Sequence, residues 1–488
     1  MVQRHRFALL GCIILSGRTR TLPASLSPRK LAMNSRLVWL VAIFPVVAWT
    51  AIDARAADAW KAGAAKANIT PDQFMWMAGY AARTKPAEGK STDLWAKALA
   101  LEDAGGQRAV LITLDLVGID RGLSTAICQK LEKKYGLDRA QIALNCSHTH
   151  SGPVVARNLR PMHEYSLERP QQELIHRYAD KLETAVIDVV GRALAALAPA
   201  QLAWGSGRTD FAVNRRNNKE ADVPKLREAG QLKGPSDHDV PVLAARSPDG
   251  KLVAVVAGYA CHATVLSGYE WSGDYPGHFQ IEVEQAHPGA VALFWAGCGG
   301  DQNPIPRRLP ELAVKYGQQL AQAVEAVLAQ PMTPVAGRLS ASYREIPLAF
   351  ATLPTRDELV AQTKDTNKYL AMRAKMLLEE IDAGRPLSQT YPYPVQRWQV
   401  GNDVEWFLLG GEVVVDYALR IKSERHGAKT WVAGYSNDVM AYIPSRRVLT
   451  EGGYEGGGAM VYYGQPTVWS EQVENQIMEE VNRQAAQK

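Results

Sequence analysis

The sequence contains few cysteines and lacks two motifs that identify common hydrolases. Five cysteines in 488 residues exclude a disulfide-dense scaffold. Neither HExxH nor GxSxG occurs, so the zincin and α/β-hydrolase families have no support. The chain also has no internal repeat, long linker or low-complexity tract. It is therefore a globular chain of enzyme size, whose function has to be inferred from the residues that its strands and helices position.

The N-terminal part has the pattern of a segment removed on export. Residues 33–56 have a basic start, an apolar run and an Ala-Arg-Ala ending, the three parts of a secretory signal peptide. An apolar run of this length also fits a membrane anchor. We expect translation to start at Met33 and cleavage to follow Ala56, so that residues 1–56 are leader and signal peptide and residues 57–488 are the mature protein. The expected location is the periplasm or the extracellular space.

Without the leader, the charge of the chain is nearly balanced. Residues 1–56 hold eight Lys and Arg and one Asp, which leaves 47 basic and 49 acidic side chains and moves the net charge from +5 to −2. The basic balance of the whole sequence therefore gives no reason to expect nucleic acid as a partner. Four cysteines remain, and both a Cys261–Cys298 bridge and free buried thiols are compatible with export.

Apolar runs alternate with segments of helical spacing. Residues 108–120 and 141–147 are strand-like and enclose a helical segment, 123–136, which predicts a β-α-β unit with parallel strands. Residues 240–262 predict a β-hairpin with a Pro-Asp-Gly turn. Further predicted elements are helices at 169–198 and 311–330, a helical and then Pro/Tyr-rich stretch at 355–395, and strands that begin near 289, 405 and 430. The expected fold class is α/β or mixed α+β: a single large catalytic domain with mixed sheets flanked by helices.

Polar side chains of catalytic type stand at or just past the C-terminal ends of the predicted strands. Ligands collect at the carboxyl ends of strands in sheets that contain parallel strands. We therefore expect these side chains to share one site. They are His148, His150, His262, Asp301, Glu412 and Tyr442.

Two histidines and a carboxylate suggest a metal. His148 and His150 are two residues apart, and such residues of an extended chain face the same side, so both rings can enter one pocket. Neutral imidazole is the commonest protein metal ligand, although a pair of hydrogen-bonded loop histidines is the alternative. His262 alone also fits a buried core histidine, and Glu412 a helix-capping carboxylate. Two histidines and a carboxylate with an open fourth position make a normal catalytic zinc set.

Several segments also share a family signature. NCSHTHSGP at 145–153 is the first of them. The others, in order, are ACHATVLSG (260–268), SGDYPG (272–277), WAGCGGDQNP (295–304), GGEVVVDYALRIK (410–422) and GYSNDVMAYIPSRRVLTEGGYEGGGAM (434–460). Together they resemble the neutral/alkaline, non-lysosomal ceramidases, zinc amidases that cleave the N-acyl bond of ceramide to sphingosine and a fatty acid. The resemblance runs from about residue 62 to 465, and the number and order of the segments carry it.

The resemblance implies roles for particular residues. His150 is expected near the scissile carbonyl, where it steers the substrate or protonates the leaving amine with a pKa near neutrality. Tyr454 and Arg215 are expected as catalytic groups on the substrate side, and Tyr454 or His150 would stabilise the oxyanion after an activated water attacks the amide carbonyl. The zinc ion, Zn2+, would be held by His148, His262, Glu412 and Tyr442.

Four other positions have alternative roles or depart from the family pattern. Asp274 and Asp301 are expected either to orient histidines and loop amides or to be plain turn residues. Where the family's glycine-containing loop has a serine before an Asn, this chain has Gly297 and Cys298. Cys298 is either a structural thiol or, at a glycine-rich turn, a replacement nucleophile. The chain also ends soon after the last similar segment, so we expect a divergent bacterial-type member without the family's C-terminal β-sandwich domain.

Both departures leave the substrate open. A ceramide-like lipid is the first expectation, and a different N-acyl or ester compound, such as an acylated sugar, is the second. A non-catalytic lipid- or carbohydrate-binding protein is the third, although an open metal position is a feature of enzymes rather than of binding modules. The expected partner is a small-molecule or lipid N-acyl substrate. Peripheral contact with a membrane surface is compatible with this expectation, and the oligomeric state is not indicated.

Overall fold

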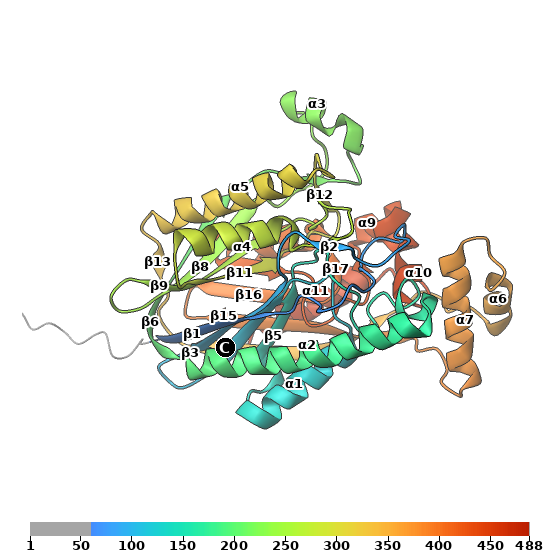
Figure 1. Ribbon diagram of the computed structural model, residues 1–488, viewed down its shortest axis with the longest axis horizontal. Coiled ribbons are helices and arrows are strands. Elements are labelled where there is room, and N and C mark those ends of the chain that lie inside the picture. The colour runs from blue at the N-terminus through green and yellow to red at the C-terminus, as the bar shows by residue number, and fades with distance from the viewer. Residues whose placement is uncertain (1–59, 488) are drawn as a thin grey trace, which may run out of the picture. The chain divides into compact units, whose positions relative to one another are not determined.

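A nine-stranded mixed sheet lies at the centre of the structure, a computed structural model that describes residues 60–487 (Figure 1). The strand order is β11-β9-β8-β6-β1-β3-β4-β5, and β13 pairs with β6 outside this path. Its strands are β1 (Trp60–Asn68), β3 (Trp95–Glu102), β4 (Arg108–Leu114), β5 (Ile142–Cys146), β6 (Ala198–Arg208), β8 (Asp239–Arg246), β9 (Leu252–Tyr259), β11 (Val291–Ala296) and β13 (Thr333–Pro334). The expected leader and signal peptide, residues 1–56, lies outside the described residues.

A second sheet of four strands, in the order β14-β15-β16-β18, packs against the first. Tryptophans fill the space between the two sheets, where large buried rings contribute most of the apolar area. They are Trp60, Trp204, Trp295, Trp398, Trp406 and Trp431. The strands are β14 (Leu339–Ala349), β15 (Thr390–Val400), β16 (Val404–Leu409) and β18 (Thr430–Ala433). Three two-stranded pairs complete the strands: β2 (Gly89–Lys90) with β10 (Glu270–Trp271), β7 (Ala212–Asn214) with β12 (Gln302–Pro304), and β17 (Glu412–Val413) with β19 (Tyr442–Ile443).

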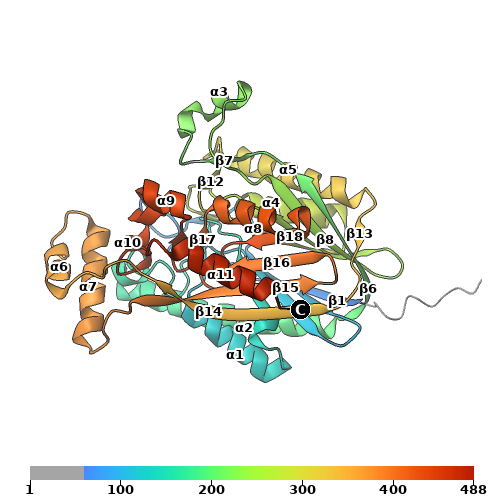
Figure 2. The same ribbon diagram turned by 180° about the vertical axis from the view of Figure 1, so that it is seen from behind.

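Helices cover the outer faces of both sheets. Along β3, Ala98 and Ala100 face the helices while Leu99 and Leu101 face the second sheet, as the two-residue period of a strand requires. Helices α1 and α2 cover one half of the large sheet and α4 and α5 the other half, whereas α8 and α11 cover the small sheet (Figures 1 and 2). The helices are α1 (Arg121–Tyr135), α2 (Arg169–Ala195), α3 (Val223–Glu228), α4 (Asp274–Ala286), α5 (Pro310–Leu328), α6 (Arg356–Gln362), α7 (Lys368–Asp382), α8 (Val415–Glu424), α9 (Arg446–Glu451), α10 (Met460–Tyr463) and α11 (Val473–Ala485). Within residues 60–487, none of them is long and apolar enough to cross a membrane.

The predicted β-α-β unit is confirmed. Strands β4 and β5 pair in parallel and α1 connects them. Asp120 caps α1 by accepting hydrogen bonds from two backbone N–H groups, and Gly136 ends it in the left-handed region with a φ of +67°. A second parallel unit, β9-α4-β11, forms the other edge of the sheet. The two edges meet, because the backbone N–H of Ala296 donates to Asn145 Oδ1 at 2.8 Å, so the carboxyl ends of β5, β9 and β11 lie close together.

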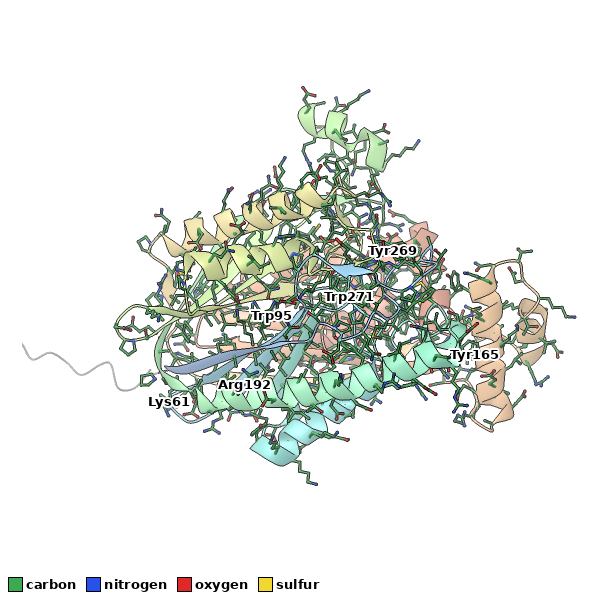
Figure 3. The ribbon with its side chains drawn as sticks, in the orientation of Figure 1. Lys61, Trp95, Tyr165, Arg192, Tyr269 and Trp271 are labelled. Carbon is green, nitrogen blue, oxygen red and sulfur yellow. The ribbon has the colours of Figure 1, made fainter. Side chains whose placement is uncertain are left out.

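Helices α6 and α7 form a hairpin inserted between β14 and β15. The strands remain paired up to Ala349 and Thr390 at the base of the insertion. The hairpin projects from one end of the molecule (Figures 1 and 2). Tyr165, just before α2, reaches it and donates to Glu379 Oε1 at 2.6 Å (Figure 3). The Pro/Tyr-rich end of the stretch expected at 355–395 is the start of β15.

Candidate functional site

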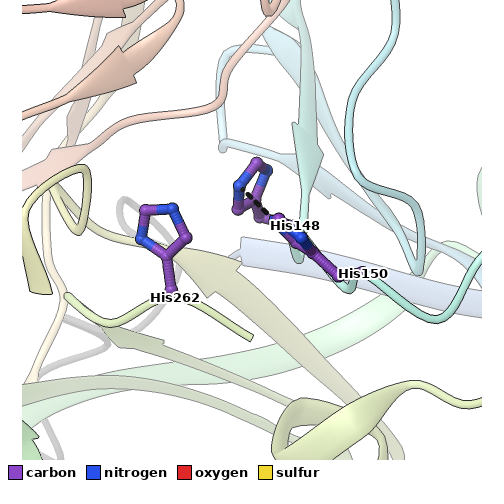
Figure 4. Close-up of side chains that lie close together, drawn as sticks. All are labelled: His148, His150 and His262. Carbon is purple, nitrogen blue, oxygen red and sulfur yellow. Dashed lines mark hydrogen bonds between the residues drawn. The ribbon is translucent and has the colours of Figure 1, made fainter. Parts of the chain in front are cut away.

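Histidines, a carboxylate and a tyrosine from distant parts of the chain meet where the two parallel units end. His148 and His150 follow β5 and His262 follows β9, and ligand nitrogens of the three rings lie within 4.8 Å of one another (Figure 4). Glu412 and Tyr442 are opposed residues of the parallel pair β17 and β19. Glu412 Oε2 lies 3.1 Å from Nε2 of both His148 and His262. The Tyr442 hydroxyl lies 3.1 Å from Nε2 of His262.

Backbone carbonyls fix the tautomers of two imidazoles. Nδ1 of His148 lies 2.6 Å from the carbonyl oxygen of Val117, and Nδ1 of His262 lies 2.7 Å from that of Gly299. A carbonyl oxygen only accepts, so each Nδ1 carries a proton, and the neutral form of either ring has its lone pair at Nε2. Burial lowers the pKa of His262 to about 4, so this ring is neutral at pH 7. Both Nε2 atoms lie near Glu412 Oε2, and they also lie near His150 Nε2 and the Tyr442 hydroxyl, respectively.

Glu412 is therefore an anion that faces hydrogen-bond acceptors. Its Oε2 is buried and receives no hydrogen bond from the described residues. Burial opposes its charge, so a low pKa of Glu412 requires positive charge beside the carboxylate, which neutral rings that present lone pairs cannot supply. Ligand atoms of a tetrahedral zinc site with bonds of about 2.0 Å are about 3.3 Å apart, close to the observed 3.1 Å. A metal cation fits this set of donors.

The histidine pair is formed by a turn and not by a strand. Residues 147–150 lie beyond β5, and His148 has a φ of +61°, in the left-handed region. The prediction that His148 and His150 share a face because the chain is extended is wrong in its reason, although their Nε2 atoms do lie 3.1 Å apart. Such a conformation costs a non-glycine residue about 1–3 kcal/mol and is typical of functional sites.

The glycine loop after β11 packs closely against the segment that carries Glu412. A Cβ on Gly300 would lie 2.6 Å from the backbone oxygen of Glu412, and the Gly300 N–H donates to Val413 O at 2.8 Å. Gly411, directly before the carboxylate, has a φ of +76°, and a Cβ there would lie 2.7 Å from the Ala441 oxygen. Glycine at these two positions lets the loop after β11 and strand β17 approach the site closely.

Arg215 holds Tyr442 in place. Its Nη2 donates to the Tyr442 hydroxyl at 3.0 Å and to the Gly300 oxygen at 2.9 Å, and its Nε donates to Glu455 at 2.7 Å. With these donors engaged, the geometry favours a positioning role for Arg215 over contact with substrate. Tyr454 differs, because 47% of it is exposed, and its hydroxyl makes no hydrogen bond to the described residues. Both side chains line a cavity of about 580 Å³.

His150 lies between the cluster and Tyr80, whose ring centroid is 4.7 Å away. Its Nδ1 has no partner among the described residues and lies against Gly79, where a Cβ would come within 2.4 Å of it. Burial lowers the pKa of His150 well below its ordinary value. This direction is opposite to the expected pKa near neutrality, and the ring is neutral at pH 7.

Asp274 and Asp301 bind backbone amides and not histidine rings. Asp274 accepts from the N–H of Leu266 at 2.8 Å, which fixes the loop after His262. Asp301 accepts from the N–H of Val415 at 2.9 Å, which joins the glycine loop to the start of α8. Of the two roles expected for these aspartates, the orientation of loop amides is the one that the geometry fits.

Comparison with known proteins adds the family. The sequence profile described as neutral/alkaline non-lysosomal ceramidase, N-terminal, matches residues 60–304. The chain belongs to this ceramidase family. Among curated relatives, the neutral ceramidases of Drosophila pseudoobscura pseudoobscura and Drosophila melanogaster are 27% and 30% identical over 117 and 98 residues. These stretches cover 23% and 19% of this chain but only 16% and 14% of the relatives, so the match spans about a sixth of their length.

Solved ceramidase structures confirm the fold. The crystal structure of neutral ceramidase from Pseudomonas aeruginosa matches with a TM-score of 0.66 and 21% identity, over 87% of this chain and 73% of that one. A structure described as ceramidase complexed with C2 matches with a TM-score of 0.65 and 20% identity, over 87% and 76% of the two chains. The expected architecture of mixed sheets flanked by helices is that of these structures.

The departures from the ceramidase signature lie inside the core. Cys298 is fully buried, and burial raises the pKa of its thiol above the ordinary value. A buried, protonated thiol is a poor nucleophile, so the structure favours the structural role for Cys298. The four cysteines of the described chain are free, which leaves Cys261 and Cys298 unbridged.

Tyr463 could not be recognised from the sequence of this ceramidase-family chain. Its hydroxyl, in α10, donates to Glu412 Oε1 from fifty-one residues away. Nothing in composition or spacing distinguishes it from the adjacent Tyr462. The contact of Tyr80 with His150 and that of Glu455 with Arg215 are also invisible in the sequence, because each joins loops that only the folded sheets bring together.

Proposed function

We propose that this protein is a zinc-dependent hydrolase that cleaves an N-acyl amide bond, with a ceramide-like lipid as its first candidate substrate. The observation that carries the proposal is the position of Glu412 Oε2, 3.1 Å from the Nε2 atoms of both His148 and His262. Buried acceptors that face one another without a donor or cation are strongly unfavourable. Membership of the ceramidase family supports the same chemistry.

The metal would be held by His148, His262, Glu412 and Tyr442. Zinc in such a set lowers the pKa of a water towards neutrality and polarises a carbonyl. The carbonyls of Val117 and Gly299 orient the two rings by accepting from their Nδ1 atoms. On the other side, Tyr463 holds the second oxygen of the carboxylate.

Three further side chains would act around the amide. His150, neutral because it is buried, would accept the proton that the attacking water loses and deliver it to the leaving amine. Tyr454 would donate its free hydroxyl to the developing oxyanion. Arg215 would act through Tyr442, whose hydroxyl it binds at 3.0 Å. This assignment needs no serine or thiol nucleophile in the loop that carries Gly297 and Cys298.

A different N-acyl substrate with a more polar amine half is the second candidate, because the cavity of about 580 Å³ beside Tyr454 is strongly charged. Hydrocarbon chains would desolvate these groups without giving them hydrogen bonds, whereas an acylated sugar or peptidoglycan fragment would bind them. The charged side chains that line the cavity are Arg215, Arg216, Glu220, Arg307, Glu451 and Glu455.

Zinc content and hydrolysis of fluorescent ceramide, measured on one purified sample, test the proposal. We expect stoichiometric zinc and turnover in the wild type, and loss of both in His148→Ala. His176→Ala is the matched control, because this histidine of α2 has a side chain 54% exposed and lies outside the cluster. Zinc without ceramide turnover, but with release of fatty acid from acylated amino sugars, would select the second candidate. A wild-type protein that binds no zinc after reconstitution would contradict the proposed mechanism.

We also propose a periplasmic or secreted location, on the signal-peptide pattern of residues 33–56. The near-neutral charge of residues 57–488 gives no reason to expect nucleic acid as a partner. Peripheral contact with a membrane surface would follow from a lipid substrate. Fractionation of cells that express the full sequence, with N-terminal sequencing of the product, tests cleavage after Ala56.

A further inference from the structure

A buried arginine without an anionic partner lies in α7. Arg373 is 7% exposed, its Nη2 donates to Gln362 Oε1 at 2.8 Å, and its buried Nε has no partner. No carboxylate oxygen within residues 60–487 lies within 4.0 Å of its guanidinium. Burial lowers the pKa of Arg373, and no charged neighbour acts against this effect. A buried charge without a counter-charge destabilises a fold, so a partner from outside the chain is expected.

The other buried arginines are better satisfied. Arg397, 8% exposed, donates to the carboxylate of Glu405 at 2.9 Å. Arg83, also 8% exposed, donates to two backbone oxygens, those of Ala78 at 2.5 Å and Gly268 at 3.1 Å. Only one neutral amide oxygen binds Arg373, although a guanidinium carries five N–H donors.

Arg373 lines a cavity of about 360 Å³ between the α6–α7 hairpin and the C-terminal segment. Gln362 and Glu358 line it on the hairpin side, and Met460 and Thr467 on the other. A single water needs only about 10–15 Å³, whereas small-molecule sites begin near 300 Å³. The cavity therefore has room for a small organic molecule.

The one carboxylate of the cavity wall does not serve Arg373. Glu358 Oε2 accepts from the N–H of Thr355 at 2.7 Å and from its hydroxyl at 2.9 Å, as part of the cap of α6. These bonds direct Glu358 to the start of its own helix. Arg373 is the one positive charge among the residues that line the cavity.

We propose that this cavity binds a small molecule that carries a phosphate or carboxylate group, with Arg373 as its anchor. The planar fork of a guanidinium matches both oxyanions with two parallel hydrogen bonds. Gln362 fixes the orientation of the fork by accepting from Nη2. The site does not depend on the proposed hydrolase activity.

Its position links it to the candidate metal centre. Gly457 and Met460, on the wall opposite the hairpin, belong to the same turn and short helix as Tyr454 and Tyr463. In Figures 1 and 2, α7 stands beside α10. A bound anion would therefore join the hairpin to the segment that carries these two tyrosines.

Titration calorimetry and thermal melting with inorganic phosphate test the site on the complete protein. We expect phosphate to bind and to raise the melting temperature of the wild type. In Arg373→Met, the affinity should fall about 10- to 100-fold, because a charge-assisted hydrogen-bonded contact is lost. The same variant should melt no lower than the wild type in phosphate-free buffer, since an unpaired charge has been replaced by an apolar side chain of similar length.

Matched variants separate this site from other phosphate sites. Arg385→Gln changes an exposed arginine just after α7 that is paired with Glu380, and it should keep the full response. His148→Ala should also keep it, which excludes phosphate bound at the histidine cluster. Tighter binding of glycerol phosphate than of inorganic phosphate would indicate that the ligand is an organic phosphate. Tighter binding of acetate than of inorganic phosphate would indicate a carboxylate. An equal phosphate response in Arg373→Met, or no response in the wild type, would overturn the proposal, and Arg373→Gln, which also removes the charge, provides a second variant with the same expected loss.

Discussion

Tyr463 supports the candidate metal centre from outside it. Its hydroxyl donates to Glu412 Oε1, so that Oε2 remains directed at His148 and His262. Removal of a hydrogen-bond partner of a metal ligand commonly lowers metal affinity or activity 10- to 100-fold. We expect Tyr463→Phe to weaken zinc binding by about tenfold or more, as measured by competition with a chromophoric chelator, while the fold is retained.

The neighbouring tyrosine provides the control for this prediction. Tyr462 makes ring contacts with Tyr369 and Tyr454, and its hydroxyl makes no hydrogen bond to the described residues. Tyr462→Phe should leave the zinc affinity unchanged. Equal zinc affinities in Tyr463→Phe and the wild type would show that the carboxylate is held without the hydroxyl.

Asp438 makes the stability of the folded protein depend on pH, and a single substitution can isolate its contribution. The residue is fully buried, and burial raises the pKa of its carboxyl to about 7, although Tyr391 donates to it at 2.6 Å. Between an unfolded pKa of about 3.9 and this value, the folded state keeps a proton that the unfolded state has lost. The free energy of unfolding contributed by Asp438 therefore falls by about 1.4 kcal/mol per pH unit as the pH rises through this window.

Asp438→Asn should remove this slope. Urea unfolding at pH 4.5, 6 and 8 should show the variant gaining stability relative to the wild type as the pH rises, with little difference at pH 4.5. Asp210→Asn changes an exposed aspartate, and its free energy of unfolding should differ from that of the wild type by the same amount at all three pH values. A constant difference between Asp438→Asn and the wild type at all three values would mean that the carboxyl is ionised in the fold.

At the scale of elements, the short strand β17 depends on the glycine that precedes it. Gly411 has a φ of +76° and no room for a Cβ, which would lie 2.7 Å from the Ala441 oxygen. Alanine there strains the backbone by about 1–3 kcal/mol and displaces Glu412, the next residue. We expect Gly411→Ala to lower the melting temperature and to weaken zinc binding together, as measured by calorimetry and metal titration.

Gly268 allows a matched substitution. A Cβ at this position meets nothing within 4 Å, and its φ is not in the left-handed region. Gly268→Ala should leave both the melting temperature and the zinc affinity near wild-type values. Loss of stability without loss of zinc affinity in Gly411→Ala would show that β17 can relax without moving its carboxylate.

The sequence predicted the elements that have local signals. The unit β4-α1-β5 has apolar runs, a helical period and a terminal glycine, and the hairpin β8–β9 has its Pro-Asp-Gly turn, so both were predictable. The curling of the large sheet was not. The two edges of the sheet meet through the hydrogen bond between Ala296 and Asn145, 151 residues apart, which no local pattern specifies.

The candidate site also has features that the sequence predicts and features that it does not. The strand-end histidines and Glu412 stand out because their residue types contrast with the apolar runs before them, and the structure brings them together. The way they meet was not predictable, because His148 adopts a left-handed conformation in place of the expected extended one. Likewise, the lowered pKa of His150 follows from burial by Tyr80 and other loops distant in sequence.

At the scale of the whole molecule, the candidate metal centre joins the two sheets. His148 and His262 follow strands of the large sheet, whereas Glu412 and Tyr442 lie in segments that continue from β16 and β18 of the small one. The bridge between Gly297 and Ala433 adds a backbone contact at the same place. A metal bound here would therefore act on the packing of the two sheets and not on one loop alone.

Removal of the metal should destabilise the whole fold. A ligand that binds only the folded state adds RT ln(1 + [L]/Kd), about 4 kcal/mol when free zinc is at a thousand times its Kd. Without it, the buried carboxylate of Glu412 faces two imidazole lone pairs with no compensating charge. We expect chelation to lower the melting temperature in a single transition, with hydrogen exchange increasing at the ends of β5, β9, β17 and β19 together.

The His148→Ala variant should melt near the chelated wild type and show no further response to chelator. A chelated wild type that melts at the temperature of the zinc-loaded protein would mean that the sheets are held together without the metal, because the packed tryptophans between them suffice.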